Sequence, residues 1–118
     1  MTDKVLLIET SPFIQSQLAP FFRNKGIHLT IASSGIEAST ILSKSFPDAI
    51  VIELPLPDIE GLSFIRSIRK TRPTIKVMVI ASSIDKGLLT ELIQLGVKNI
   101  FIKPFSIETL LATIQASP

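Results

Sequence analysis

The residues best suited to chemistry stand directly after short apolar runs of the chain. They are Glu9 and Thr10, Glu53, Ser82 and Ser83, and Lys103. If the runs are parallel strands, their carboxyl ends meet at one edge of a sheet, so two carboxylates and one ammonium could converge there. In open α/β sheets, ligands bind outside the carboxyl ends of the strands, so this edge is where we expect a site.

The composition excludes several other kinds of site. The chain has no cysteine, which excludes disulfides, thiolate metal sites and a cysteine nucleophile. Its one histidine, His28, begins an expected strand far from the carboxyl ends, so we expect it to be structural or solvated. Neither GxxxxGK nor GxGxxG occurs, which argues against a nucleotide site. Ser82 and Ser83 have no base nearby in the sequence and are expected to be loop and cap residues.

The apolar runs predict a buried parallel sheet. Four segments are continuously apolar and rich in branched residues, which is typical of strands covered on both faces: 5–8, 49–52, 77–80 and 100–102. Residues 28–32 alternate and predict a fifth strand nearer an edge. Helical periods fill the intervals, over 11–26, 35–45, 62–70, 86–95 and 107–115. The chain is thus (βα)5, with helices on both faces of the sheet.

The helical period also assigns faces. Pro20 falls inside the first helix, where we expect a kink or an early break. We expect a solvated face on the outer side and end of the third helix, formed by Arg66, Arg69, Lys70 and Arg72. Apolar residues of the first three helices are expected to face inward: Ile14, Leu18, Phe21, Phe22, Ile36, Ile41, Leu42, Leu62, Ile65 and Ile68.

Length and charge bound the class of protein. With 118 residues, 46% hydrophobic and 19% charged, the chain is expected to be a single domain over 1–118. No apolar run approaches the roughly 18 to 20 residues that cross a bilayer, so we expect a cytoplasmic protein with no membrane contact. The formal charge of +2 is too small to predict a nucleic-acid partner.

An ordered set of motifs resembles a known family. In chain order the motifs are SPF at 11–13, PD at 47–48, LPDIEG at 56–61, LG at 95–96 and KPF at 103–105. With the alternation of elements, they resemble the receiver domain of bacterial two-component response regulators, over essentially the whole chain. The resemblance implies a flavodoxin-like three-layer sandwich with strand order 2-1-3-4-5, phosphorelay signal transduction, and a cis bond at Lys103–Pro104.

The acidic positions of that family are altered. The resemblance places a magnesium-binding acidic pair at Glu9, a longer acid, and Thr10, which is uncharged. It places the phosphorylated aspartate of the family at Glu53. The acidic pocket is therefore changed in both the number and the length of its carboxylates.

The switch positions are altered as well. The Ser or Thr that hydrogen-bonds the new phosphoryl group in the family falls at Ala81, although Ser82 follows and a register shift of one residue stays open. The aromatic switch residue falls at Ile100. Phe101 is adjacent, but strand alternation directs it to the opposite face and into the core. Only Lys103 matches a functional position unchanged.

These departures predict a degenerate receiver, or pseudo-receiver. Magnesium requires near-octahedral oxygen ligands at about 2.0 to 2.1 Å, which Glu9, Thr10 and Glu53 are poorly placed to supply. We expect no cofactor and no metal; if one binds, Glu9 and Glu53 would hold it. The protein would then be no enzyme and would act through protein contacts without phosphorylation. The alternative is a magnesium-dependent switch that accepts a phosphoryl group on Glu53 or a neighbour, helped by Glu9 and Asp58.

Two interpretations of Glu53 stay open. In the first, it forms a partly buried ion pair with Lys103, which avoids an unpaired charge. In the second, it imitates the phosphorylated state permanently. The imitation would be partial, because a phosphate carries about 1.5 to 2 charges and three acceptor oxygens, whereas a glutamate has one charge and two oxygens.

The remaining surface points to a protein partner. From 106 to 118 only Glu108 is charged, whereas an exposed amphipathic helix normally has a charged outer face. With the leucines of the fourth helix and Ile100, the face formed by the fourth helix, fifth strand and fifth helix is expected to be apolar. The family resemblance implies that this face forms dimers or meets effectors. An effector domain would be joined by a linker beginning at 116–118.

Overall fold

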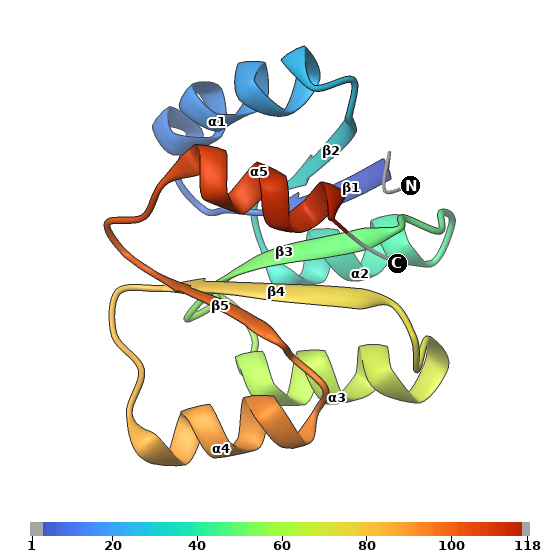
Figure 1. The fold of residues 1–118 in the computed structure, drawn as a ribbon. Coiled ribbons are helices and arrows are strands. Elements are labelled where there is room, and N and C mark those ends of the chain that lie inside the picture. The colour runs from blue at the N-terminus through green and yellow to red at the C-terminus, as the bar shows by residue number, and fades with distance from the viewer. Residues whose placement is uncertain (1–3, 117–118) are drawn as a thin grey trace.

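The computed structural model describes residues 4–116, which alternate between strands and helices (Figure 1). The strands are β1 (Lys4–Ile8), β2 (His28–Ala32), β3 (Ala49–Leu54), β4 (Lys76–Ala81) and β5 (Asn99–Ile102). The helices are α1 (Pro12–Asn24), α2 (Gly35–Leu42), α3 (Gly61–Thr71), α4 (Lys86–Gln94) and α5 (Ile107–Gln115). Within residues 4–116, every helix is too short or too polar to span a membrane.

The strands form one parallel sheet in the order β2-β1-β3-β4-β5, so the predicted fold class is confirmed. α1 and α5 cover one face of the sheet, and α2, α3 and α4 cover the other (Figure 1). The direction in which strands are added reverses between β1 and β3. In open α/β sheets, a crevice forms at that point, outside the carboxyl ends of the strands.

Two apolar layers hold the sheet between the helices. Successive strand residues point to opposite faces, so a strand buried on both faces has to be apolar throughout. One layer, under α2, α3 and α4, includes Leu6, Ile8, Ile50, Ile52 and Val79 from the strands. The other, under α1 and α5, includes Val5, Leu7, Val51, Met78 and Ile80. As alternation predicted, Ile100 packs against the first layer and Phe101 against the second.

Two residues predicted to face inward are exposed, and the early break that was one alternative at Pro20 does not occur. α1 continues to Asn24 without an early break at Pro20. Pro20 and Ser16 are both exposed, so water can bond the Ser16 carbonyl that lacks a helical partner. Phe21 is 45% exposed because Phe22, fully buried, occupies the inner face of α1. Ile36 is 61% exposed at the first turn of α2, whose inner face is made by Ala38, Ile41 and Leu42.

Candidate functional site

The predicted polar residues gather at the carboxyl end of the sheet. Glu9 directly follows β1, Glu53 is the penultimate residue of β3, and Ala81 ends β4. These three strands are neighbours. Lys103 follows β5, and its backbone N–H donates to the Ala81 carbonyl at 2.9 Å, which extends the β4–β5 pairing to this edge. The parallel sheet therefore brings the four positions onto one edge.

Glu53 and Lys103 form an ion pair. The ammonium of Lys103 donates to Oε2 of Glu53. The Glu53 side chain is 14% exposed and that of Lys103 is 37% exposed, so the pair lies at the rim of the sheet rather than within it. The opposite charge compensates the partial desolvation of the carboxylate. The first interpretation of Glu53, a partly buried ion pair, describes this contact.

Glu9 is buried at the start of α1. It is 3% exposed, and its Oε2 accepts the backbone N–H of Ser11 at 3.0 Å. The first N–H groups of a helix have no intrahelical partner and favour a nearby negative charge. The amide of Gln15 donates to the Glu9 carbonyl at 2.6 Å and to Oγ of Ser33 at 3.0 Å, which fixes this turn from both sides. Thr10, between the acid and the helix, is exposed.

The two positions that the resemblance assigns to the switch, Ala81 and Ile100, are apolar and packed. Ala81 is 2% exposed, whereas Ser82 and Ser83 are exposed. Ile100 is partly buried against the layer under α2, α3 and α4. The Lys103–Pro104 peptide bond is cis, as the family resemblance implied. A second cis bond, Leu54–Pro55, follows Glu53 and was not predicted.

Two acids near the site cap helices, a role that the sequence reasoning missed. The carboxylate of Asp58 accepts the N–H groups of Gly35 at 2.9 Å and Ile36 at 2.8 Å, at the start of α2. These bonds, that of Ile36 first, lower the pKa of Asp58 against an opposing desolvation. The Ser63 hydroxyl and the first N–H groups of α3 likewise lower the pKa of Glu60. An acid directly before a helix, as in Glu60-Gly61, was the available signal.

The present arrangement of these acids does not fit a magnesium ion. Among residues 4–116, no group of three or more His, Cys, Asp or Glu side chains is placed to hold a metal. Magnesium needs several oxygen ligands in near-octahedral geometry. Glu9 instead accepts an N–H bond, and Glu53 faces an ammonium. In this arrangement one oxygen of each carboxylate, Oε2, is already bonded.

The fold and the position of this site agree with one protein family. Residues 5–115 match the response regulator receiver domain, so this chain belongs to that family. The family acts in two-component signalling, and its members are signalling modules rather than classical enzymes. The sequence resemblance to this family is therefore confirmed at the level of family and fold.

Individual relatives give the same result. The chain is 27% identical to the probable C4-dicarboxylate response regulator DctR of Bacillus subtilis, over 95% of this chain and 50% of DctR. It is thus about half the length of that relative. A Francisella response regulator receiver domain superimposes with a TM-score of 0.85 at 27% identity, over 95% and 93% of the two chains. The beryllofluoride-activated NtrC4 receiver domain dimer gives 0.86 at 29% identity, over 95% and 93%.

Proposed function

We propose that this receiver domain signals through protein contacts and does not take up a phosphoryl group at its own pocket. The observation that carries the proposal is the ion pair of Glu53, at the phosphoacceptor position, with Lys103. In other members of the family, the resemblance implies an aspartate at the position of Glu53 and an acidic pair beside it. Here the equivalent positions hold a longer acid, a buried acid that caps α1, and a threonine.

Electrostatics supports this proposal. A carboxylate attacks a phosphoryl group only if the negative charge that develops is neutralised, and in such reactions a divalent cation supplies that neutralisation. The cation would compete for Oε2 of Glu9 with an N–H group and for Oε2 of Glu53 with an ammonium. Thr10 offers a hydroxyl without charge.

The same residues argue for one static conformation rather than a permanently active one. A glutamate presents less charge and fewer oxygens than a phosphate. Ala81 has no hydroxyl to donate a hydrogen bond to that negative charge, and Ile100 packs against apolar residues. We therefore favour the ion-pair interpretation of Glu53 over mimicry of phosphorylation.

A phosphoryl-accepting switch is the second candidate, and the retained Lys103 favours it. Incubation with acetyl phosphate and Mg²⁺, followed by acid quenching and intact mass, separates the two. We expect no added phosphoryl mass on the wild-type chain. The matched positive control is the combined variant Glu9→Asp, Thr10→Asp, Glu53→Asp, Ala81→Thr, which restores the family residue types at the acidic positions and at the hydroxyl position. A phosphoryl group on wild-type Glu53 or a neighbour would refute the proposal.

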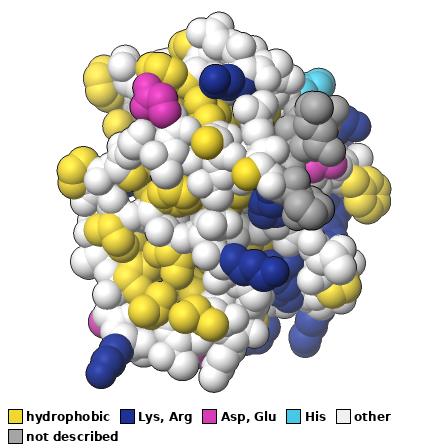
Figure 2. Space-filling view, in the orientation of Figure 1, with side chains coloured by type: hydrophobic (Ala, Val, Ile, Leu, Met, Phe, Trp, Pro, Cys, Tyr) yellow, Lys and Arg dark blue, Asp and Glu magenta, His cyan; other side chains and the backbone are white. Residues whose placement is uncertain are grey.

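The contact surface that we propose lies on α4 and β5. Leu89 is 39% exposed, Ile93 60% and Ile102 44%, and Figure 2 shows hydrophobic side chains gathered in that region, at the lower left. α5 adds less than the sequence suggested, because Leu110 and Ile114 are buried. Contiguous exposed apolar surface of this kind marks interaction sites.

A second copy of the domain is the occupant to test first, since the NtrC4 receiver of similar fold was solved as a dimer. Light scattering should give a dimer mass for the wild type and a monomer mass for Ile93→Lys. Ile36→Lys is the matched control, because Ile36 is equally exposed on the distant helix α2. A monomer for the wild type would refute the dimer and leave an effector domain as the partner. We also propose that the domain acts in the cytoplasm.

A further inference from the structure

The charges of this domain are separated between the two ends of the sheet. At the end where strands begin and helices terminate lie Lys4, Arg23, Lys25, Lys44, Arg69, Lys70, Arg72, Lys76 and Lys98. Among the described residues, Asp48 is the acid at that end. Figure 2 shows the Lys and Arg side chains gathered on the right, where the strands begin in Figure 1. A net charge of +2 conceals this basic end, which would attract acidic partners over distances of about 10 Å.

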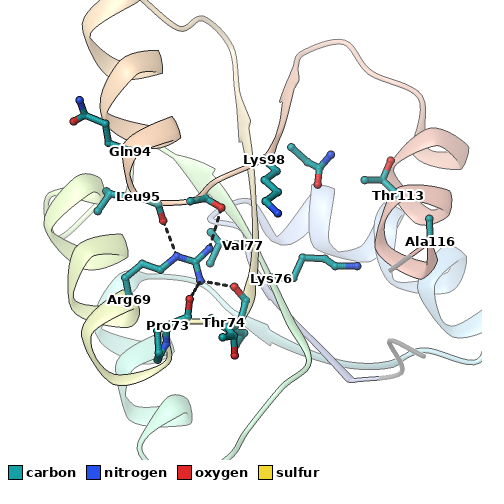
Figure 3. A pocket seen from close by; sticks show the side chains of 13 residues that line it. Arg69, Pro73, Thr74, Lys76, Val77, Gln94, Leu95, Lys98, Thr113 and Ala116 are labelled. Atoms are coloured by element: carbon teal, nitrogen blue, oxygen red, sulfur yellow. Dashed lines mark hydrogen bonds between the residues drawn. The ribbon is translucent and has the colours of Figure 1, made fainter. Parts of the chain in front are cut away.

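The basic end contains a groove of about 830 Å³. Its walls are the ends of α3, α4 and α5 and the starts of β4 and β5 (Figure 3). The volume lies within the range of about 300 to 1,000 Å³ that is usual for binding pockets. Leu95, Ile75 and Val77 give the lining an apolar part, while Thr74 and Asn99 add polar groups. We call this feature the amino-end groove.

The basic side chains of the amino-end groove differ in how many of their N–H groups are available to a ligand. Arg69 belongs to the wall of the groove, because its guanidinium donates to backbone carbonyls on both sides of it. Lys76 extends toward α5, where its ammonium donates to the Ile114 carbonyl at 3.0 Å and keeps further protons free. Burial lowers the pKa of Lys76, with no offsetting carboxylate among residues 4–116. Lys98 is exposed and extends into the groove from β5 (Figure 3).

We propose that the amino-end groove binds a short acidic and apolar peptide segment of a partner protein, with Lys76 and Lys98 pairing its carboxylates. The site lies at the opposite end of the sheet from the pocket at Glu53, and its lining does not include Leu89, Ile93 or Ile102 of the proposed contact surface. Charge complementarity requires an anionic occupant, and the apolar part of the lining requires one with apolar side chains as well. A sugar-phosphate backbone meets only the first requirement, so a peptide fits better than a nucleic acid.

Fluorescence anisotropy at low salt tests the proposal with a labelled short peptide of glutamate and leucine residues. The same peptide with glutamine in place of glutamate, and a labelled oligothymidylate, are the comparison probes. We expect the acidic peptide to bind more tightly than either. Amide chemical-shift changes should concentrate at Thr74, Lys98 and Asn99.

Two matched variants separate the groove from general attraction by the basic end. Lys98→Gln should weaken binding about tenfold, because it removes a charged hydrogen-bond donor from the site. Lys70→Gln removes the same charge at an exposed position of the same end outside the groove, and should change binding by less than about twofold. Equal losses in the two variants, no binding of the acidic peptide, or tighter binding of oligothymidylate would each overturn the proposal.

Discussion

Arg69 joins α3 to the start of β4 and the end of α4, and we predict that its removal lowers the stability of the fold. Its Nε donates to the Leu95 carbonyl at 2.6 Å and its Nη2 to that of Gly96 at 3.2 Å. Nη1 donates to the carbonyls of Pro73, at 3.4 Å, and Ile75. Replacing Arg69 with methionine keeps the apolar stem and removes every one of these bonds.

The expected loss of stability follows from those bonds. A hydrogen bond to a charged group contributes about 1.5 to 3 kcal/mol net, but here the bonds share one guanidinium and border an open groove. Water will reach part of the released carbonyls, so we expect Arg69→Met to lower the free energy of unfolding by about 2 to 4 kcal/mol. Arg69→Lys should recover only part of this, because an ammonium lacks the planar fork that serves carbonyls on two sides.

Urea unfolding followed by circular dichroism measures the effect. With a slope of about 2 kcal/mol/M, in the middle of the usual range for a small domain, the midpoint for Arg69→Met should fall by about 1 to 2 M. Lys70→Met is the control, because Lys70 is exposed on the same turn, and its change should stay within about 0.5 kcal/mol. The reasoning fails if Arg69→Lys is as stable as the wild type, since charge alone would then explain the role, or if the two methionine variants are equally stable.

Three further predictions concern caps, turns and the core. The pKa of Asp58 is lower in the folded state than its unfolded value near 3.8. The ionised carboxylate therefore stabilises the fold above that value, and this stabilisation is lost as the pH falls through the folded-state pKa. Urea midpoints for Asp58→Asn should depend less on pH below about 4 than those of the wild type. Gly96 and Gly26 both have positive φ, but only at Gly96 would an added Cβ meet a neighbour, at 3.3 Å, so Gly96→Ala should lower the melting temperature more than Gly26→Ala, and equal shifts would contradict this. Phe22→Ala should destabilise by about 3 to 5 kcal/mol and Phe21→Ala by much less in the same urea assay, because only Phe22 is fully buried.

Periodicity predicted the fold because a buried parallel strand and an amphipathic helix each leave a local pattern. The strands read from 49–52 and 77–80 were correct but short, since β3 continues through Glu53 and Leu54. In β3 the polar residue Glu53 ends the apolar run before the strand ends, and in β4 the polar residue Lys76 precedes the run although the strand has already begun. Pattern alone cannot locate that boundary.

Long-range contacts were beyond the sequence reasoning. The solvated face predicted on α3 is only partly present, because Arg69 and Arg72 both turn to backbone carbonyls, and Arg72 also lies 4.5 Å from the centre of the Phe46 ring. Their acceptors lie far away in the chain, for Arg69 at Leu95 and for Arg72 at Leu42. A helical wheel shows that an arginine points outward from its own helix, but not that another helix ends beside it.

The acids at the carboxyl end of the sheet bear on how the proposed loss of phosphoryl chemistry could be reversed. Glu9, Asp58 and Glu60 accept backbone N–H groups at the starts of α1, α2 and α3. In such a bond the N–H group and the positive end of the helix dipole both stabilise the carboxylate, so a cation would have to compete with them for its oxygens. We therefore expect Glu53→Asp alone to leave the chain unphosphorylated by acetyl phosphate, because it shortens one acid without freeing Glu9. Phosphorylation of that single variant would refute this reasoning. It would mean that the length of the acceptor side chain prevents the reaction in the wild type, and not the hydrogen bonds of the neighbouring carboxylates.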